Sequence, residues 1–391
     1  MFRTSRTGGW LAGLLLLQCQ AGPAPYPWIR LGGPELELLT NGEAAVAAEA
    51  VAELANLRSA WRDALPVGAE RDTRLRIVAF ASEAEYQPFR INAFSPAYFV
   101  GGVGQDTIVL GHLTRANFPA LRHEFVHHLL RARWRSLPLW LEEGLADYYG
   151  GVDSGVGQMR ASRLRRGGML SLQELASVGR GSASYQDREA ARQFYAQSWA
   201  LTHLLMTAET YRAEAWVFVD LLNQGESLES AVEWVYGRSL PQLQEDLAAH
   251  LGRLTTKTLV AQRTAHAEVA STVGADEVKL ELARLLVRKG DLRGAQEYLD
   301  ELVESSRGNP ELWSLAGDLA LKQGRSFEAQ IALQEALRLG SRDARGLRQL
   351  AVLEQRAMNR SGLEPALARL VEVDPADDEA RGALASLQAS R

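Results

Sequence analysis

The chain has 391 residues, of which 46% are hydrophobic and 23% are charged. This composition is ordinary for a folded protein, and the length exceeds that of one typical domain, so we expect two domains. A net charge of −5 argues against a nucleic-acid-binding protein and against a general acidic-membrane surface. The function therefore has to be sought in local motifs.

Residues 1–21 have the pattern of a secretion signal peptide. Arg3 and Arg6 precede an apolar core at 10–17 that is too short to span a membrane as a mature helix. Two outcomes are open: cleavage after Ala21, or lipidation of Cys19, which follows Leu-Leu-Gln as in a bacterial lipoprotein box. Both predict an exported protein, periplasmic or associated with the outer membrane. Membrane contact is expected only in the second case, through a lipid anchor at Cys19.

The region between the signal peptide and residue 110 predicts a small sheet with accompanying helices. Gly32-Gly33-Pro34 interrupts an alternating stretch, which indicates a hairpin, and Ser82 is a good helix cap. In chain order we expect a hairpin at 28–39, a helix at 44–65, a strand at 75–80, a short helix at 82–89, and strands at 98–103 and 107–110.

The most informative motif is His123-Glu124-Phe125-Val126-His127. Side chains four residues apart lie on the same face of a helix, so His123 and His127 can bind one ion with Glu124 beside them. This is the HExxH arrangement of zinc hydrolases, in which the glutamate is the general base. The alternative is a surface helix that carries two unrelated histidines.

A hydrolytic zinc ion usually takes a third protein ligand and leaves one position for water. The stretch 137–148, L-P-L-W-L-E-E-G-L-A-D-Y, predicts a second helix that begins near Pro138. Glu143 and Asp147 share one face of it, so Glu143 can bind the metal while Asp147 holds a ligand histidine by its free ring N–H. Glu142 points about 100° away from Glu143 and is not expected to bind the metal.

Together the two motifs resemble the gluzincin zinc metallopeptidases, most closely the bacterial peptidase MA-like proteins, over residues 123–148. The resemblance implies an α+β fold, with a thermolysin-like catalytic domain over residues 22–251 in which a small twisted sheet packs beside the motif helix. It also implies a Zn²⁺ ion held by His123, His127 and Glu143, and a peptide or protein substrate. The sequence contains no G-A-M-E-N element of the aminopeptidase branch, so we expect an endopeptidase.

The same resemblance implies that Tyr195 donates a hydrogen bond to the oxyanion of the substrate. Packing of Tyr195 against Trp199 is an equally open alternative. Three other tyrosines compete for the role: Tyr148, Tyr149 and Tyr185. The resemblance also implies that an edge strand within Tyr98–Leu110 holds an extended peptide by backbone pairing, and plain structural strands are the alternative.

Beyond residue 150 the sequence predicts mainly helices. The clearest are expected at 187–207, 214–223, 227–236 and 240–254. A group of arginines is expected on a solvated face rather than in a binding patch: Arg160, Arg163, Arg165 and Arg166. His128 lies about 140° around the motif helix from His123, and His203 lies on an apolar helix, so both are expected to be structural.

From Ala275 the chain repeats at an interval of 34 residues, as in the pairs Gly290 and Gly324, and Ala295 and Ala329. This is the period of tetratricopeptide helix pairs, which residues 275–391 resemble, with a degraded third unit around 358–365. We therefore expect an all-α solenoid after a linker at 252–274. A platform for a partner protein is the expected function of the repeats, and a stabilising cap on the catalytic domain is the alternative.

The sequence as a whole predicts an exported zinc-dependent endopeptidase in which Glu124 is the general base. The rival hypothesis is a catalytically silent envelope scaffold that acts through its repeats.

Overall fold

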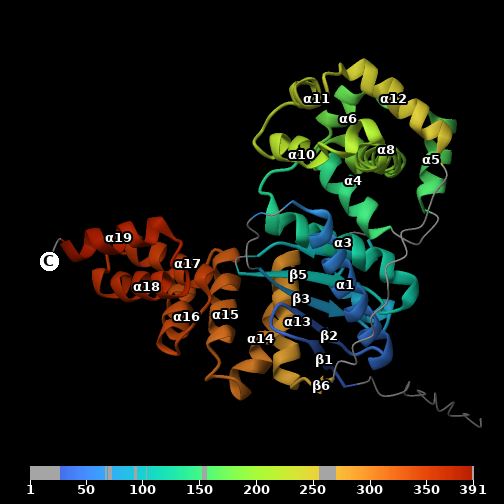
Figure 1. Ribbon diagram of the computed structural model, residues 1–391. Coiled ribbons are helices and arrows are strands. Elements are labelled where there is room, and N and C mark those ends of the chain that lie inside the picture. The colour runs from blue at the N-terminus through green and yellow to red at the C-terminus, as the bar shows by residue number, and fades with distance from the viewer. Residues whose placement is uncertain are drawn as a thin grey trace, which may run out of the picture.

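The structure is a computed structural model that describes residues 27–66, 68, 73–91, 95–102, 104–151, 156–254 and 270–389. The predicted signal peptide and Cys19 lie outside the described residues. Within the described ranges, no helix is both long enough and apolar enough to cross a membrane. The fold is mixed α/β, with one small sheet and many helices (Figure 1).

The sheet has the strand order β4-β5-β3-β2-β1-β6. Its strands are β1 (Ile29–Gly32), β2 (Leu36–Thr40), β3 (Arg74–Ala79), β4 (Ala97–Val100), β5 (Gln105–Leu110) and β6 (Ser271–Thr272). The predicted hairpin is confirmed as the antiparallel pair β1–β2, while β2, β3 and β5 run parallel. At one edge β4 is antiparallel to β5, and at the other edge β6 is antiparallel to β1.

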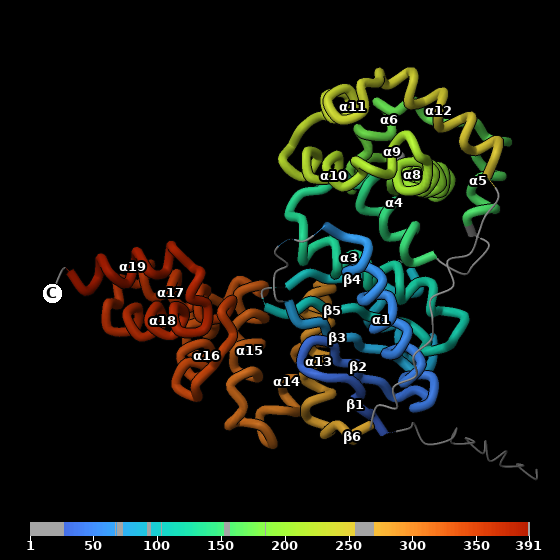
Figure 2. Tube along the Cα trace, viewed as in Figure 1, coloured from blue at the N-terminus to red at the C-terminus, as the bar shows by residue number. Residues whose placement is uncertain are grey.

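Alternation along the strands gives the sheet two different faces. Leu75 and Ile77 of β3 point to the face covered by α1 (Ala44–Ala64) and α3 (Phe118–Arg133), in the largest apolar core of the described chain. Val78, the next residue of β3, points to the opposite face, which is covered by α13 (Ala275–Lys289). Figure 2 shows these helices on the two sides of the sheet.

A helical layer follows α3 in the chain and packs above it. It comprises α4 (Leu139–Gly150), α5 (Val156–Gly167), α6 (Leu172–Ser177), α7 (Ala183–Gln186), α8 (Arg188–Thr207), α9 (Glu209–Arg212), α10 (Ala215–Asn223), α11 (Leu228–Tyr236) and α12 (Leu240–Arg253). The long α8 lies at its centre, where α4, α5 and α12 contact it. The four helices predicted here correspond to α8, α10, α11 and α12. Between β3 and β4 lie α2 (Glu83–Tyr86), which Ser82 caps as predicted, and a short 3₁₀ turn.

The C-terminal helices keep the 34-residue interval of the sequence. They are α13, α14 (Leu292–Ser305), α15 (Pro310–Lys322), α16 (Ser326–Arg338), α17 (Ala344–Arg356), α18 (Arg360–Val373) and α19 (Asp378–Ala389). Gly290 caps the C-terminus of α13, and Gly324 lies just beyond the C-terminus of α15. Both have positive φ values, 92° and 76°. Met358, at the equivalent position of the third unit, also has a positive φ, 52°. The backbone therefore preserves the period where the side chain does not.

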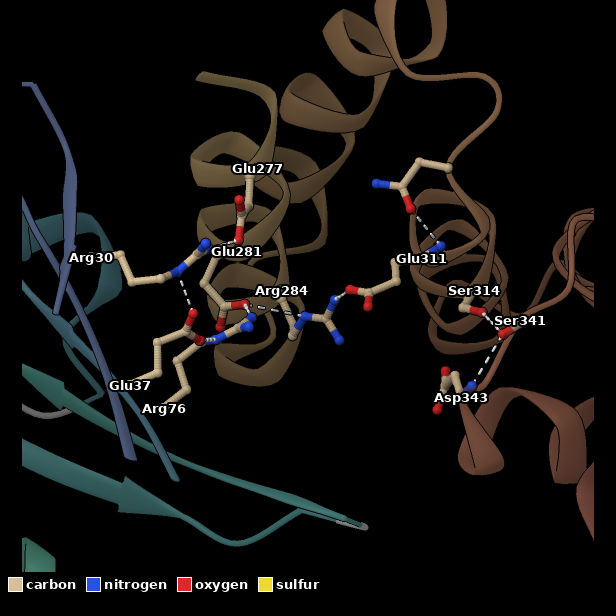
Figure 3. Close-up of polar contacts among 11 residues, drawn as sticks. Arg30, Glu37, Arg76, Glu277, Glu281, Arg284, Glu311, Ser314, Ser341 and Asp343 are labelled. Atoms are coloured by element: carbon tan, nitrogen blue, oxygen red, sulfur yellow. Dashed lines mark hydrogen bonds and ion pairs between the residues drawn. The ribbon is translucent and has the colours of Figure 1, made fainter. Parts of the chain in front are cut away.

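The first repeat helix is part of the sheet's own packing. One apolar cluster joins Val78 and Val109 of the strands to Leu285 and Leu286 of α13. Beside this cluster, Arg76 of β3 pairs with Glu37 of β2 and with Glu281 of α13, each at 2.8 Å. Figure 3 shows the extension of these contacts through Arg284 to Glu311 of α15. Most of the predicted linker 252–274, residues 255–269, lies outside the described residues. Near its end, β6 pairs with β1, so this part of the linker belongs to the sheet.

Candidate metal site and cleft

The site is built where α3 and α4 cross closely. Gly150 at the end of α4 packs on α3, and a Cβ added there would lie 2.8 Å from the backbone nitrogen of His123. The Gly150 carbonyl accepts a hydrogen bond of 2.8 Å from Arg122 Nε of α3. Pro138 precedes the first turn of α4, where its fixed φ suits the start of a helix. A small residue and a local turn thus set the crossing of the two motif helices.

Three potential ligand atoms converge at this crossing. His123 Nε2 lies 3.1 Å from His127 Nε2, and Glu143 Oε2 lies 3.3 Å from the first and 3.5 Å from the second. Two atoms bound about 2.0–2.1 Å from a tetrahedral ion stand about 3.3 Å apart. The edges of the triangle therefore match the ligand spacing of a tetrahedral metal site.

The chemistry of Glu143 also fits a cation. Its side chain is 3% exposed, and Oε2 is a buried acceptor that meets no donor in hydrogen-bonding geometry among the described residues. Leaving such an acceptor without a partner is costly, and a metal ion would supply one. His123, His127 and Glu143 form the one group of three or more potential metal-binding side chains found in the described part of the chain.

A second carboxylate fixes the orientation of His123. Nδ1 of His123 donates to Asp147 Oδ1 at 2.9 Å, which leaves Nε2 of the same ring directed at the triangle. The other oxygen of Asp147 lies 2.7 Å from Arg160 Nη2 of α5. Arg160 was predicted to be solvated, but its side chain is only 20% exposed and it is committed to this ion pair. No pattern in the sequence connects Arg160 to the motif.

The charges at the site favour a cation. Burial alone would raise the pKa of Glu143, but the neighbouring imidazoles outweigh burial and hold that pKa well below its usual range. Burial would lower the pKa of His123, and Asp147, Glu143 and Glu124 together raise it well above its usual value. Burial alone would raise the pKa of Asp147, but Arg160 and His123 outweigh it and lower that pKa. The net negative charge that would hold a proton on His123 is equally suited to a divalent cation.

The triangle opens into a cleft of about 440 Å³. Glu124, the second residue of the motif, lines this cleft beside the three potential ligands. Tyr195 and Tyr185 also line it. The Tyr185 hydroxyl lies 3.3 Å from Glu143 Oε1 and 3.0 Å from the Tyr195 hydroxyl. Both tyrosines are therefore placed for hydrogen bonding at the site, and the structure puts Tyr185 in direct contact with Glu143.

The other two tyrosines that competed for the role are directed elsewhere. Tyr149 packs edge-on against Trp61, and Tyr148 packs against the ring of His203. His203 lies 2.8 Å from His250, away from the cleft lining, which agrees with the expected structural role. His128 is buried and hydrogen-bonds Asp106 of β5 at 2.9 Å, so it ties α3 to the sheet, as its position on the helix predicted.

The side chains of Glu142 and Glu143 point in different directions, as helical geometry predicts. Glu142 pairs with Arg180 at 2.8 Å on the cleft wall, while Glu143 turns into the triangle. The sequence did not single out Arg180, nor did it single out Arg131 and Arg135, which line the cleft beyond His127. These residues have no motif of their own, although Arg131 lies one helical turn after His127 and could have been placed from that spacing.

No protein-family model matches the chain, and no curated protein matches it at a significant level.

Proposed function

We propose that the chain is a zinc-dependent endopeptidase of the gluzincin type, similar to the peptidase MA-like proteins and with a thermolysin-like catalytic domain. One observation carries the proposal. His123, His127 and Glu143 form a triangle with tetrahedral edge lengths in a cleft that Glu124 also lines. A structural zinc ion is usually enclosed by four protein ligands, whereas three ligands facing a cleft are typical of catalytic zinc.

The proposed roles follow from position. When bound, zinc would polarise the scissile carbonyl and lower the pKa of a water molecule toward neutrality. Glu124 takes the proton of the attacking water and passes it to the leaving amine. Asp147 keeps His123 in the tautomer whose Nε2 carries the lone pair. Glu124 lines the cleft, and Asp147 acts through its hydrogen bond to His123.

For the oxyanion we propose that Tyr195 donates the stabilising hydrogen bond. The Tyr195 hydroxyl is 3.0 Å from that of Tyr185, which is held near Glu143 Oε1. Burial, followed by the charge of Glu143, raises the pKa of Tyr195 well above its usual value. The phenol therefore keeps its proton at neutral pH and can donate to a developing negative charge. Tyr185 would orient Tyr195.

We propose that an extended peptide substrate binds along the edge strand β4. It is the last strand of the sheet on this side, and its residues Tyr98 and Phe99 line the cleft. The ring of Phe99 stacks 6.4 Å from the ring of His127. A free strand edge beside the potential ligands offers backbone groups to a substrate by strand addition.

The repeats and the cellular location complete the proposal. We infer that α13–α19 form a tetratricopeptide-type solenoid that binds a partner protein, in keeping with their 34-residue interval. Export to the periplasm or outer membrane is proposed from the sequence of residues 1–21, with lipidation of Cys19 as one form of it.

The decisive experiment pairs Glu124→Gln with zinc analysis. Glu124 is not one of the triangle atoms, so the variant should retain one zinc per chain while peptide hydrolysis falls by at least about a thousandfold. Turnover is measured on a mixed peptide library, with and without a chelator, and zinc by elemental analysis. Undiminished turnover of the variant would remove Glu124 from the mechanism, and absence of zinc in the wild-type protein would refute the metallopeptidase. An inactive, zinc-loaded wild-type protein would favour the scaffold alternative.

A further inference from the structure

The cleft continues from the potential metal ligands along the C-terminal end of α3. Its wall there is formed by Leu130, Arg131, Trp134, Arg135 and Leu137. Arg131 lies one turn after His127, which corresponds to a rise of about 6 Å along the helix axis. An extended peptide advances about 3.3 Å per residue, so this wall lies about two residues from a bond held at the metal.

Three acidic side chains line the cleft, each with a role already assigned, whereas one arginine has none. Glu124 is the proposed general base. Glu142 is paired with Arg180, and Glu143 belongs to the potential metal site. Arg135 is exposed, and its side chain makes no ion pair within the described ranges of the chain. This part of the cleft therefore presents positive charge that a ligand could neutralise.

Arg131 adds positive charge beside Arg135. Its Nη2 donates to the Gly102 carbonyl at 3.2 Å, and its Nε lies 3.8 Å from Asp106 Oδ1. Asp106 also holds His128 through its other oxygen, so a single buried carboxylate serves two basic side chains. These contacts fix the Arg131 side chain in place. It is nevertheless 38% exposed and lines the cleft.

The segment that carries Arg135 is anchored from outside the cleft. The backbone nitrogens of Arg135 and Ser136 both donate to Asn223 Oδ1, at 2.9 and 3.1 Å. Trp134 Nε1 donates to Asp220 Oδ1 at 2.7 Å. Asn223 of α10 thus holds the backbone here and Asp220 holds the Trp134 side chain. The segment from which Arg135 projects is therefore fixed, which reduces the entropy lost when its side chain binds an anion.

We propose that the cleft selects peptides with an acidic side chain two to three residues from the scissile bond, with Arg135 as the main contact and Arg131 as a second. The inference rests on the proposed endopeptidase function. The carboxylate of a bound Glu or Asp accepts hydrogen bonds from the guanidinium of Arg135, and Leu130 and Leu137 pack against its methylene groups. Charge-assisted hydrogen bonds of this kind are stronger than neutral ones and are sensitive to salt where they are exposed.

The test uses octapeptides of Ala and Leu in which one Glu is moved position by position, and a matched set with Gln. Binding is measured by fluorescence anisotropy on the zinc-loaded Glu124→Gln protein, and hydrolysis on the wild-type protein. At one or two adjacent positions we expect Glu to be favoured over Gln by about ten- to a hundredfold. Arg135→Gln should remove most of this preference, and raised salt should weaken it.

The control is Arg293→Gln, which changes net charge equally at an α14 side chain that is 93% exposed and far from the cleft lining. It should leave the Glu preference intact. The inference is overturned if the Glu and Gln peptides bind with equal affinity or if neither set binds. It is also overturned if the preference for Glu survives combined replacement of Arg131 and Arg135. Cleavage of both sets at equal rates would overturn the inference alone. Acid-selective binding that depends on Arg135 but without any hydrolysis by the wild-type protein would support the inference and count against the proposed catalysis.

Discussion

The two faces of the sheet hold their helices by different means. On the α3 face, the strands present apolar side chains such as Ile77 and Ile108, and the Asp106–His128 pair adds a buried polar contact. On the α13 face, part of the packing is ionic, because Arg76 meets Glu37 and Glu281 there. Glu281 is 4% exposed, so its charge depends on these partners for stability.

Apolar packing and buried ion pairs contribute differently to stability and to the position of a helix on the sheet. Apolar packing gives most of its free energy through area removed from water and is weakly directional. A buried ion pair adds little net stability over an apolar pair, yet removal of one partner is strongly destabilising. The α3 face therefore supports the helix that carries two of the potential metal ligands, and the α13 face fixes the register at which α13 packs on the sheet.

The largest change in stability is expected from Glu281→Ala on the α13 face. It leaves the Arg76 guanidinium buried with one partner fewer, and the free energy of unfolding should fall by about 3 kcal/mol. Zinc affinity of the folded protein should stay unchanged, because the ligands are on the other side of the sheet. Chemical denaturation and zinc titration measure the two quantities. Glu297→Ala, at an exposed pair 3.9 Å apart in α14, is the matched control and should change stability by less than about 0.5 kcal/mol. A parallel loss of zinc affinity in Glu281→Ala would break the separation of the two faces.

A smaller loss of stability, this time accompanied by a loss of zinc affinity, is expected from Gly144→Ala. The added Cβ would lie 2.2 Å from Thr202 Oγ1 and 2.6 Å from the Ser198 carbonyl oxygen of α8, so α4 must shift. Overpacking costs about 1–3 kcal/mol, of which the better helix propensity of alanine returns up to about 1. Because Glu143 is the adjacent residue, zinc affinity should fall at least about tenfold.

The control for this variant is Gly252→Ala in α12, where the added methyl group meets nothing within 4 Å. It should lower neither the free energy of unfolding nor zinc affinity. Unchanged zinc binding in Gly144→Ala would show that the α4–α8 contact does not position Glu143.

The smallest effect is expected at the far end of the repeats, from Met358→Gly. Met358 has a φ of 52°, is 90% exposed, and stands where earlier units have glycine. Relief of the left-handed strain, less the added entropy of the unfolded chain, should raise the free energy of unfolding by about 0.5–1 kcal/mol. The change is read from denaturation curves, with zinc affinity as the internal control. A destabilised variant would mean that the Met358 side chain contributes packing that its exposure hides.

Much of the candidate site could be predicted because its determinants are local. The four-residue interval brings His123 beside His127, and the same interval puts Glu143 and Asp147 on one face of α4. The parting of Glu142 from Glu143 also follows from helical rotation. The choice between Tyr185 and Tyr195 could not be made, because both lie at the cleft and their approach depends on how α7 and α8 pack.

The sequence by itself determined the periodic features of this protein: the strand alternation, the spacing of the potential ligands and the 34-residue interval of the C-terminal helices. Each of these depends on backbone geometry that acts over a few residues. Only the tertiary structure decided that Arg160 pairs with Asp147, that Arg135 faces the cleft, and that Arg76 meets Glu281, 205 residues away along the chain. Such pairings are set by which charges are buried together when the whole core forms, and no local pattern records that choice.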